Sequence, residues 1–369
     1  MLAVATAGKG RVPEGSFPEE QQCRDFAAPL AVHYALRMID EDTCWAISDG
    51  AAGNERQARA LAESLGFAPR VLRLRVAQPW DLFAPRLLAG ARGAIRDADG
   101  HTLQPPWPAI AIGCGRRAAL ATRLLRAWSD GRCYAVQVLD PRIDTRAWDL
   151  VVAPQHDGVD APNVIRSIGA LNPVDARWLA EGRRRFPAFG ELPAPRTAVL
   201  VGASTRAQRL DGAYFDALLD RLTRRPPGSF LVSVSRRTPP ATAARLRAAF
   251  APYPGVFWGG SDDGANPYAG MLGWADRFVV TPDSVNMLSE ACATGRPVST
   301  FAPRPIRGKL ARFHAELAAS GHLRAPGEAA AQPQPPPLAE TAAIAELVRE
   351  RWHAARAARA QVWPSRGSS

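Results

Sequence analysis

Lysine is almost missing from this sequence. It occurs only at Lys9 and Lys309, so 46 minus 2 leaves 44 arginines among the 46 basic residues. Such arginine use, with many alanines and prolines, is typical of a GC-rich genome, and it weakens the net charge of +11 as a sign of a polyanionic partner. The arginines also form short clusters among acidic residues, whereas nucleic-acid binders gather them on one face. We therefore expect no nucleic-acid partner.

Cysteines are few and scattered. The sequence has no C-x-x-C pair and no paired histidine spacing of the kind that holds zinc. Isolated cysteines in odd number favour reduced, buried thiols over a disulfide framework, which is typical of a cytosolic protein. The five are Cys23, Cys44, Cys114, Cys133 and Cys292. We expect neither a metal site nor a cofactor.

Long apolar runs are missing as well, because arginine or a helix breaker interrupts every stretch before the ~20 apolar residues of a membrane span. Residues 1–13 lack the charged-then-apolar order of a signal peptide. There is also no P-loop, G-x-S-x-G or H-E-x-x-H motif, and the acidic segments at 97–100 and 262–264 are typical of turns. We expect a cytoplasmic protein, with peripheral contact to the inner membrane left open.

The length of 369 residues predicts about two domains, since a single core stops growing near ~250 to 300 residues. Short apolar runs alternate with helical stretches in both halves of the chain, and a proline-rich segment at 186–196 separates the halves. Fully apolar strands in such alternation indicate a parallel sheet covered on both faces. The sequence predicts an α/β fold of two tandem Rossmann-like, doubly wound domains that face each other across a cleft.

Composition also predicts the boundaries of these domains. An N-terminal extension at 1–43, with a candidate amphipathic helix at 30–39, precedes the first domain. An arginine-rich amphipathic helix follows the second domain, and its apolar stripe favours packing on the first domain over binding to a membrane surface. The predicted segments are a first domain at 44–185, a linker at 186–196, a second domain at 197–325, a second linker at 326–338 and the final helix at 339–369.

Polar turns follow several strands of the second domain. In the segment 279–298 a buried strand runs through Thr281 and Asp283 to a helix that begins at Ser284. The free N–H groups and the dipole of a helix start bind phosphate or another anion. Asn286 and Glu290 share one face of this helix. The Glu290 carboxylate can accept both ribose hydroxyls of a nucleotide, or form a salt bridge with an arginine.

Two more turns of this domain are candidates for the same ligand. Arg236 and Arg237 stand at a strand end, and their guanidinium groups match diphosphate geometry, although a solvated turn fits them equally. Ser204 lies in the turn 202–205, whose glycine lets the backbone approach a ligand closely. Several polar strand ends in one domain favour the ligand.

The first domain offers a turn of its own at 48–54, which is not a G-x-G-x-x-G dinucleotide motif. Asp49 in this turn is a candidate general base, or a helix-entry residue. His156, beside Asp157 at another strand end, is a second candidate proton acceptor, or a satisfied loop histidine. The other candidate groups at these strand ends are Gly50, Gly53, Asn54, Gln57, Asp140 and Arg142.

Several of these motifs, in this order, resemble the elongated-mitochondria family of plant mitochondrial fission factors and their bacterial relatives. The similarity extends from Cys44 to about Arg324 and includes WAISDGAAGNERQ at 45–57, DPR at 140–142, the turn 154–157, SRRTP at 235–239, the segment 281–298 and Lys309 at a helix start. Ala51 and Asn54 depart from it, since small-basic and histidine residues are commoner there. The extension at 1–43 lies outside the similarity.

The resemblance implies a fold like that of GT-B glycosyltransferases, and two functions. The first is metal-independent transfer of a sugar from a nucleotide-sugar to a cell-envelope or membrane-associated acceptor. The second domain would hold the donor, with Arg236 or Arg237 and the helix start at Ser284 on the diphosphate and Glu290 on the ribose, while Asp49 or His156 deprotonates the acceptor. The second is a non-catalytic adaptor for a membrane-remodelling partner, because plant members are described as bringing a dynamin-related protein to mitochondria.

Overall fold

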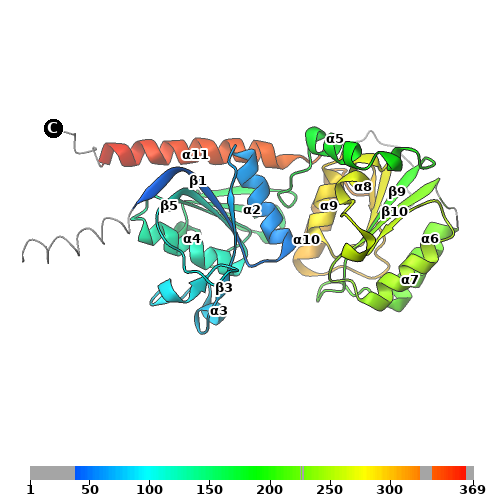
Figure 1. Ribbon diagram of the computed structural model, residues 1–369, viewed down its shortest axis with the longest axis horizontal. Coiled ribbons are helices and arrows are strands. Elements are labelled where there is room, and N and C mark those ends of the chain that lie inside the picture. Colours follow the sequence, from blue (N-terminus) through cyan, green and yellow to red (C-terminus); the bar gives the residue numbers. More distant parts are fainter. Residues whose placement is uncertain (1–37, 225, 227, 325–334, 363–369) are drawn as a thin grey trace, which may run out of the picture.

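The computed structural model describes residues 38–224, 226, 228–324 and 335–362. Two lobes lie side by side, each with a parallel sheet between helices, and one long helix, α11 (Glu340–Val362), lies along the first lobe (Figure 1). The predicted helix at 30–39 lies outside the described residues except for its last two, and Ile39 already belongs to the first strand. Among the described residues, no helix is long and apolar enough to cross a bilayer.

The first domain is built on a six-stranded parallel sheet in the order β2-β1-β5-β6-β7-β8. The strands are β1 (Ile39–Ser48), β2 (Arg70–Arg73), β5 (Trp107–Cys114), β6 (Tyr134–Val138), β7 (Leu150–Pro154) and β8 (Val164–Ser167). Helix α2 (Ala52–Ser64) covers one face and helix α4 (Arg116–Trp128) the other. Alternate residues of β1 enter the two cores, with Cys44 and Ala46 on the α2 side and Trp45 and Ile47 on the α4 side. A strand buried on both faces needs such an uninterrupted apolar run.

A small subdomain follows β2. It contains the antiparallel pair β3 (Arg75–Val76) and β4 (Ile95–Arg96), with the short helix α3 (Trp80–Phe83) between them. Ala84 and Ile95 pack into the α4-side core, so the subdomain is attached to the first domain by buried contacts. It projects from the first lobe at the end where α3 is labelled in Figure 1.

The second domain repeats the plan with five parallel strands in the order β11-β10-β9-β12-β13. They are β9 (Arg196–Val201), β10 (Ser229–Val234), β11 (Gly255–Trp258), β12 (Arg277–Val280) and β13 (Val298–Thr300). Helices α6 (Gly212–Thr223) and α7 (Pro240–Phe250) cover one face, while α8 (Tyr268–Trp274), α9 (Val285–Cys292) and α10 (Gly308–Ala319) cover the other. The predicted α/β fold of two tandem parallel domains is confirmed.

Two helices tie the domains together. Helix α5 (Ala176–Arg185) precedes the predicted linker, yet Trp178 and Leu179 pack on the second core and Gly182 touches the backbone of α8. Helix α11 (Glu340–Val362) returns to the first domain, where Ile344, Val348 and Trp352 join the α2-side core, and Figure 1 shows it along the top of the first lobe. The chain therefore crosses between the domains twice.

Candidate functional site

A buried hydrogen-bond network joins the carboxyl ends of β9 and β12. Asp283 is 7% exposed and accepts from the backbone N–H of Ala203 at 3.0 Å and from the Thr281 hydroxyl at 2.6 Å. The Thr281 oxygen in turn accepts from the N–H of Gly202 at 2.8 Å. A Cβ on Gly202 would lie 2.1 Å from an Asp283 oxygen, so the close approach needs glycine. These residues fix the two turns relative to each other.

Burial raises the pKa of Asp283, while the bonds from Thr281 and Ala203 act against the rise. The Arg237 guanidinium lies 4.0 Å from the same carboxylate. Three predicted site residues, Thr281, Asp283 and Arg237, are thus brought together. Thr281 and Asp283 are buried and hold the two turns together, whereas Arg237 is exposed to solvent.

The β10 turn belongs to this edge of the sheet as well. The Thr238 hydroxyl donates to the carbonyl of Gly202 at 2.7 Å and lies 3.0 Å from the Ser235 hydroxyl. Arg236 is exposed, and its positive charge acts on Glu55 in the first domain. The pKa of Glu55 is lowered mainly by the hydrogen bond from Arg73, and Arg236 contributes in the same direction. Arg236 therefore lies within electrostatic reach of the first domain.

Ser204 and Ser284 have local roles. The Ser204 hydroxyl bridges the N–H of Leu210 at 2.9 Å and the carbonyl of the same residue at 3.0 Å. The Ser284 hydroxyl accepts from the N–H of Met287 at 3.4 Å and caps α9. Ser284 thus uses one of the helix-start donors within the protein.

The first turns of α2 and α9 meet across the domain boundary. Gln57 donates to the side-chain oxygen of Asn286 at 3.2 Å. A Cβ on Gly53 would lie 2.0 Å from the amide nitrogen of Asn286, so α2 approaches α9 closely at a glycine. Each helix follows the carboxyl end of a central strand, β1 or β12, so the two strand-end turns converge on one interdomain region.

Glu290 is held at the same boundary by two partners. Its side chain is 2% exposed, one oxygen forms an ion pair with Arg56 of α2, and the other accepts from the Tyr268 hydroxyl at 2.5 Å. The Arg56 guanidinium also lies 5.5 Å from the centre of the Tyr268 ring. Burial and the neighbouring carboxylate raise the pKa of Tyr268 well above its ordinary value. Of the two partners that the sequence allowed for Glu290, a ribose or an arginine, this structure shows the arginine.

Asp49 sits in an Asx turn at the end of β1. Its Oδ1 accepts from the N–H of Ala51 at 3.1 Å and from the side chain of Asn54 at 3.0 Å. Gly115, at the end of β5, is so close that a Cβ there would lie 2.6 Å from the Asn54 amide and 3.4 Å from Asp49 Oδ2. Gly50 has a φ of +85°, which favours glycine. Asp49 is half-buried at the strand-end edge.

His156 lies in a buried contact with α10. It is 6% exposed, its ring centre is 5.1 Å from that of Phe313, and its Nδ1 has no hydrogen-bond partner. Nδ1 lies 3.7 Å from Glu316 Oε2, another buried atom without a partner. Burial lowers the pKa of His156, with Lys309 and Arg312 acting in the same direction and Asp157 against it. Its surroundings are those of an interdomain contact.

Lys309 of the second domain forms ion pairs with two carboxylates of the first domain, next to His156. Its ammonium donates to Asp140 Oδ2 and Asp157 Oδ1, each at 2.9 Å. Arg312 donates to the carbonyl of His156 at 2.7 and 2.9 Å. Arg142 has its N–H on Asp140 Oδ1 at 2.8 Å and a φ of +57°. Asp140, Arg142 and His156 are thus grouped, and Asp140 is already engaged by Lys309.

The sequence did not indicate roles for Arg56 and Tyr268 or the partners of Lys309. Arg56 lies in the stretch 45–57, and the signal for it was its place on the helix turn shared with Gly53 and Gln57. Tyr268 carried no local signal, because its partner lies 22 residues away on another helix.

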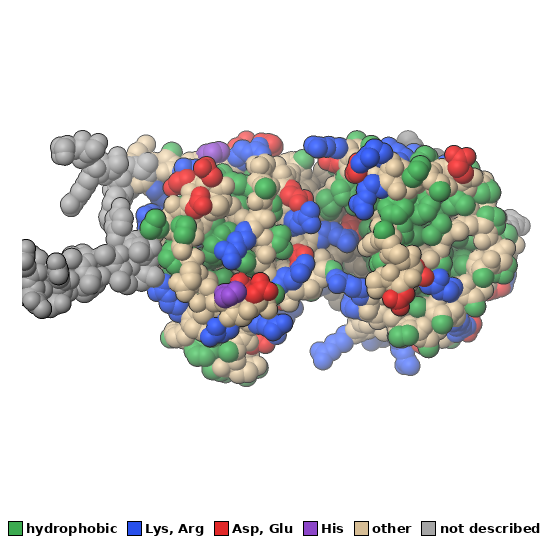
Figure 2. Space-filling model, in the orientation of Figure 1, with side chains coloured by type: hydrophobic (Ala, Val, Ile, Leu, Met, Phe, Trp, Pro, Cys, Tyr) green, Lys and Arg blue, Asp and Glu red, His purple; other side chains and the backbone are tan. Residues whose placement is uncertain are grey.

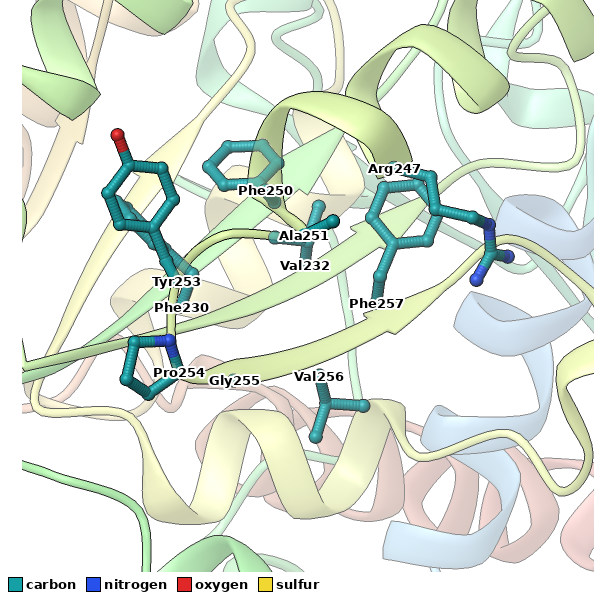
Figure 3. A pocket seen from close by; sticks show the side chains of 10 residues that line it. All are labelled: Phe230, Val232, Arg247, Phe250, Ala251, Tyr253, Pro254, Gly255, Val256 and Phe257. Carbon is teal, nitrogen blue, oxygen red and sulfur yellow. The ribbon is translucent and has the colours of Figure 1, made fainter.

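Two further features lie elsewhere. A shallow pocket between the end of α7 and β11 is lined mainly by Phe230, Phe250, Tyr253 and Phe257, near the amino ends of β10 and β11 (Figure 3). It is therefore opposite the strand-end turns. In the segment 97–100, the N–H groups of Asp99 and His101 bond to Asp97 Oδ1 at 3.1 and 2.9 Å, which makes a turn.

Comparison with known proteins gives a family and several relatives. The family model described as mitochondrial fission ELM1 matches residues 52–352. The mitochondrial fission protein ELM1 of Arabidopsis thaliana is 29% identical over 265 residues, which cover 64% of this chain and 61% of that protein. An uncharacterized protein of Rickettsia prowazekii, RP120, is 24% identical over 302 residues, covering 70% and 83%. The chain thus spans about three-fifths of the plant relative.

Solved structures give weaker likenesses. The glycotransferase of kitacinnamycin has a TM-score of 0.47 at 13% identity, covering 85% of this chain and 94% of that chain. MurG of Acinetobacter baumannii has a TM-score of 0.43 at 14% identity, covering 85% and 93%.

Proposed function

This chain belongs to the mitochondrial fission ELM1 family, and we propose that it is a GT-B-like, metal-independent glycosyltransferase. It would take a nucleotide-sugar as donor and a cell-envelope or membrane-associated acceptor, at the cytoplasmic side of the inner membrane. The observation that carries the proposal is the convergence of α2 and α9, where Gln57 contacts Asn286 and Arg56 contacts Glu290. Open parallel sheets bind ligands at such strand ends.

The second domain supplies groups suited to a diphosphate. Arg236 and Arg237 are exposed beside the turn that Asp283 fixes, and the start of α9 adds a helix dipole of the favourable sign. Negative charge develops on the departing diphosphate during transfer, and fixed cationic donors stabilise it without a metal ion. Ribose recognition by Glu290 requires that the nucleotide displace Arg56, because both Glu290 oxygens are engaged here.

The first domain supplies the proton acceptor. The two hydrogen bonds to Asp49 end on Oδ1 and hold the carboxylate in place, and Oδ2 would take the proton of the acceptor hydroxyl. His156 is the weaker choice, because its ring is buried against Phe313. Asn54, Gly50 and Gly53 shape the acceptor side of the same turn.

One observation favours the adaptor as a second candidate. Both oxygens of the Glu290 carboxylate already have partners, Arg56 and Tyr268, so this buried charge needs no nucleotide to balance it. An adaptor would keep this contact permanently and bind its membrane-remodelling partner elsewhere. The name of the plant relative, a mitochondrial fission protein, fits that role.

A thermal-shift screen with nucleoside diphosphates and nucleotide-sugars separates the two. The enzyme is expected to gain about 2.7 kcal/mol at a ligand concentration 100 times Kd. At the same ligand concentration Arg236→Ala should lose about half of this gain or more. Arg224→Ala, at an exposed arginine paired with Asp220 on α6, should keep it. Absence of stabilisation by every nucleotide favours the adaptor. Turnover that survives Asp49→Asn would remove Asp49 as the base.

A further inference from the structure

Two large apolar side chains are exposed together on α3. Leu82 is 65% and Phe83 is 51% exposed, and we call this pair the apolar tip. The residues around it are firmly packed. Ala84 is buried in the α4-side core, and the Trp80 indole donates to the carbonyl of Ala89 at 2.7 Å. The tip thus projects from the short helix α3, whose neighbours are buried or hydrogen-bonded, and two adjacent exposed apolar side chains make a small apolar patch.

Arginines surround the apolar tip. Arg116 donates to the carbonyl of Leu82 at 3.3 Å, and Arg123 contacts the carbonyl of Pro85. Arg86 donates to the carbonyl of Arg142 at 3.0 Å, and both side chains are exposed. Figure 2 shows hydrophobic atoms at the lower end of this lobe with Lys and Arg side chains next to them.

The acidic neighbour of the tip is neutralised. Asp81 binds Arg117 at 2.8 Å and Arg116 at 3.2 Å, and the hydrogen bond from Arg117 lowers its pKa. Two arginines thus balance one carboxylate beside Leu82 and Phe83, and Arg86, whose printed contact is to a backbone carbonyl, adds a further positive charge. An apolar pair rimmed by arginine matches the acyl boundary and the negative headgroups of an anionic bilayer.

The tip also lies on the side of the proposed acceptor site. The subdomain follows β2, and Arg116 and Arg117 begin α4 at the carboxyl end of β5, beside β1. Arg117, which binds Asp81, is also within the electrostatic reach of Asp49. We propose that Leu82 and Phe83, with Arg86 and Arg116, form a docking surface for an anionic lipid bilayer.

This inference names the surface that presents the membrane-associated acceptor of the proposed function, but its test needs no nucleotide-sugar. Co-sedimentation of the full chain is measured with vesicles of phosphatidylcholine, with and without one part in about three of phosphatidylglycerol. We expect binding to the anionic vesicles that weakens with salt. Leu82→Asp combined with Phe83→Asp should weaken it about tenfold or more, and Arg86→Glu about fivefold or more.

The matched control is Leu347→Asp, since Leu347 is 45% exposed on α11, away from α3. It should bind vesicles like the unmodified chain. Thermal unfolding confirms that each variant is folded. Failure of the unmodified chain to bind anionic vesicles, or equal binding by the double variant, would overturn the proposal. The proposal would also be overturned if the unmodified chain forms a dimer that the double variant loses while vesicle binding is unchanged. The apolar tip would then serve self-association. If the chain binds anionic vesicles but transfers no sugar, the docking surface stands and the proposed enzymatic function fails.

Discussion

Glu290 shows what residue spacing can and cannot predict. Its position two turns into a strand-end helix pointed to a polar contact, and the sequence left ribose and arginine as alternatives. The structure supplies an arginine, Arg56, from 234 residues earlier in the chain. No local pattern pairs residues so distant. Asp283, in contrast, was selected from its turn, and its bond from Thr281 lies within that turn. Its bond from Ala203, 80 residues earlier in the chain, could not be predicted from the local pattern.

Replacing Glu290 should be costly for folding. Glu290→Ala leaves Arg56 and the buried Tyr268 hydroxyl without their shared acceptor. We expect a loss of about 2 to 4 kcal/mol in the free energy of unfolding, measured in urea. Glu63→Ala, which removes an exposed pair with Arg59, should change it by less than about 1 kcal/mol. Equal effects in the two variants would contradict the assignment of Glu290 as a buried interdomain contact.

The buried histidines should make stability depend on pH. Burial lowers the pKa of both His156 and His314 in the folded chain, so below about pH 6.5 the unfolded chain binds protons that the folded chain does not. Stability is therefore full above that pH and falls as the pH decreases from 7 to 5. Each excluded proton contributes up to about 1.4 kcal/mol per pH unit.

Urea unfolding at pH 5, 6 and 7 measures this slope. His156→Gln should reduce it, and His101→Gln, at an exposed histidine, should leave it unchanged. A slope that is the same in His156→Gln and the unmodified chain would contradict the burial of this ring as its cause.

At the scale of elements, continuous apolar runs were the clearest strand signal. The second half of β1 and the whole of β5 are buried on both faces, so their composition indicates them. β8 alternates buried and exposed residues over only four positions, and α5 contains three consecutive arginines, so neither stood out. Their places are set by tertiary packing, as the contact of Gly182 with the backbone of α8 shows.

Gly182→Ala should test this packing. Its Cβ would lie 2.3 Å from the backbone oxygen of Ala269, so the two helices must separate. We expect a loss of about 1 to 3 kcal/mol in unfolding free energy. Gly212→Ala is the matched control, because its nearest atom is 3.5 Å away in the Arg245 side chain. It should be neutral or stabilise by up to about 1 kcal/mol, and a Gly182→Ala variant as stable as this control would be incompatible with the α5 contact.

At the scale of the whole molecule, the two-domain plan followed from chain length and repeated alternation, but the interdomain contacts did not. The ion pairs of Lys309 with Asp140 and Asp157 join residues more than 150 positions apart. The Arg56 contact with Glu290 and the return of α11 add two further links. The sequence indicated candidate ligand groups in both domains. It did not indicate that some of them, such as Gln57 and Asn286, contact each other across the domain boundary.

If the proposed function is right, a nucleoside diphosphate binds between the domains at Arg236. Isothermal titration calorimetry with the diphosphate that shifts the melting temperature most measures its Kd directly. We expect saturable binding with one site, weakened about tenfold or more in Arg236→Ala and unchanged in Arg224→Ala. Absence of binding to the unmodified chain, or an equal Kd in Arg236→Ala, would contradict it.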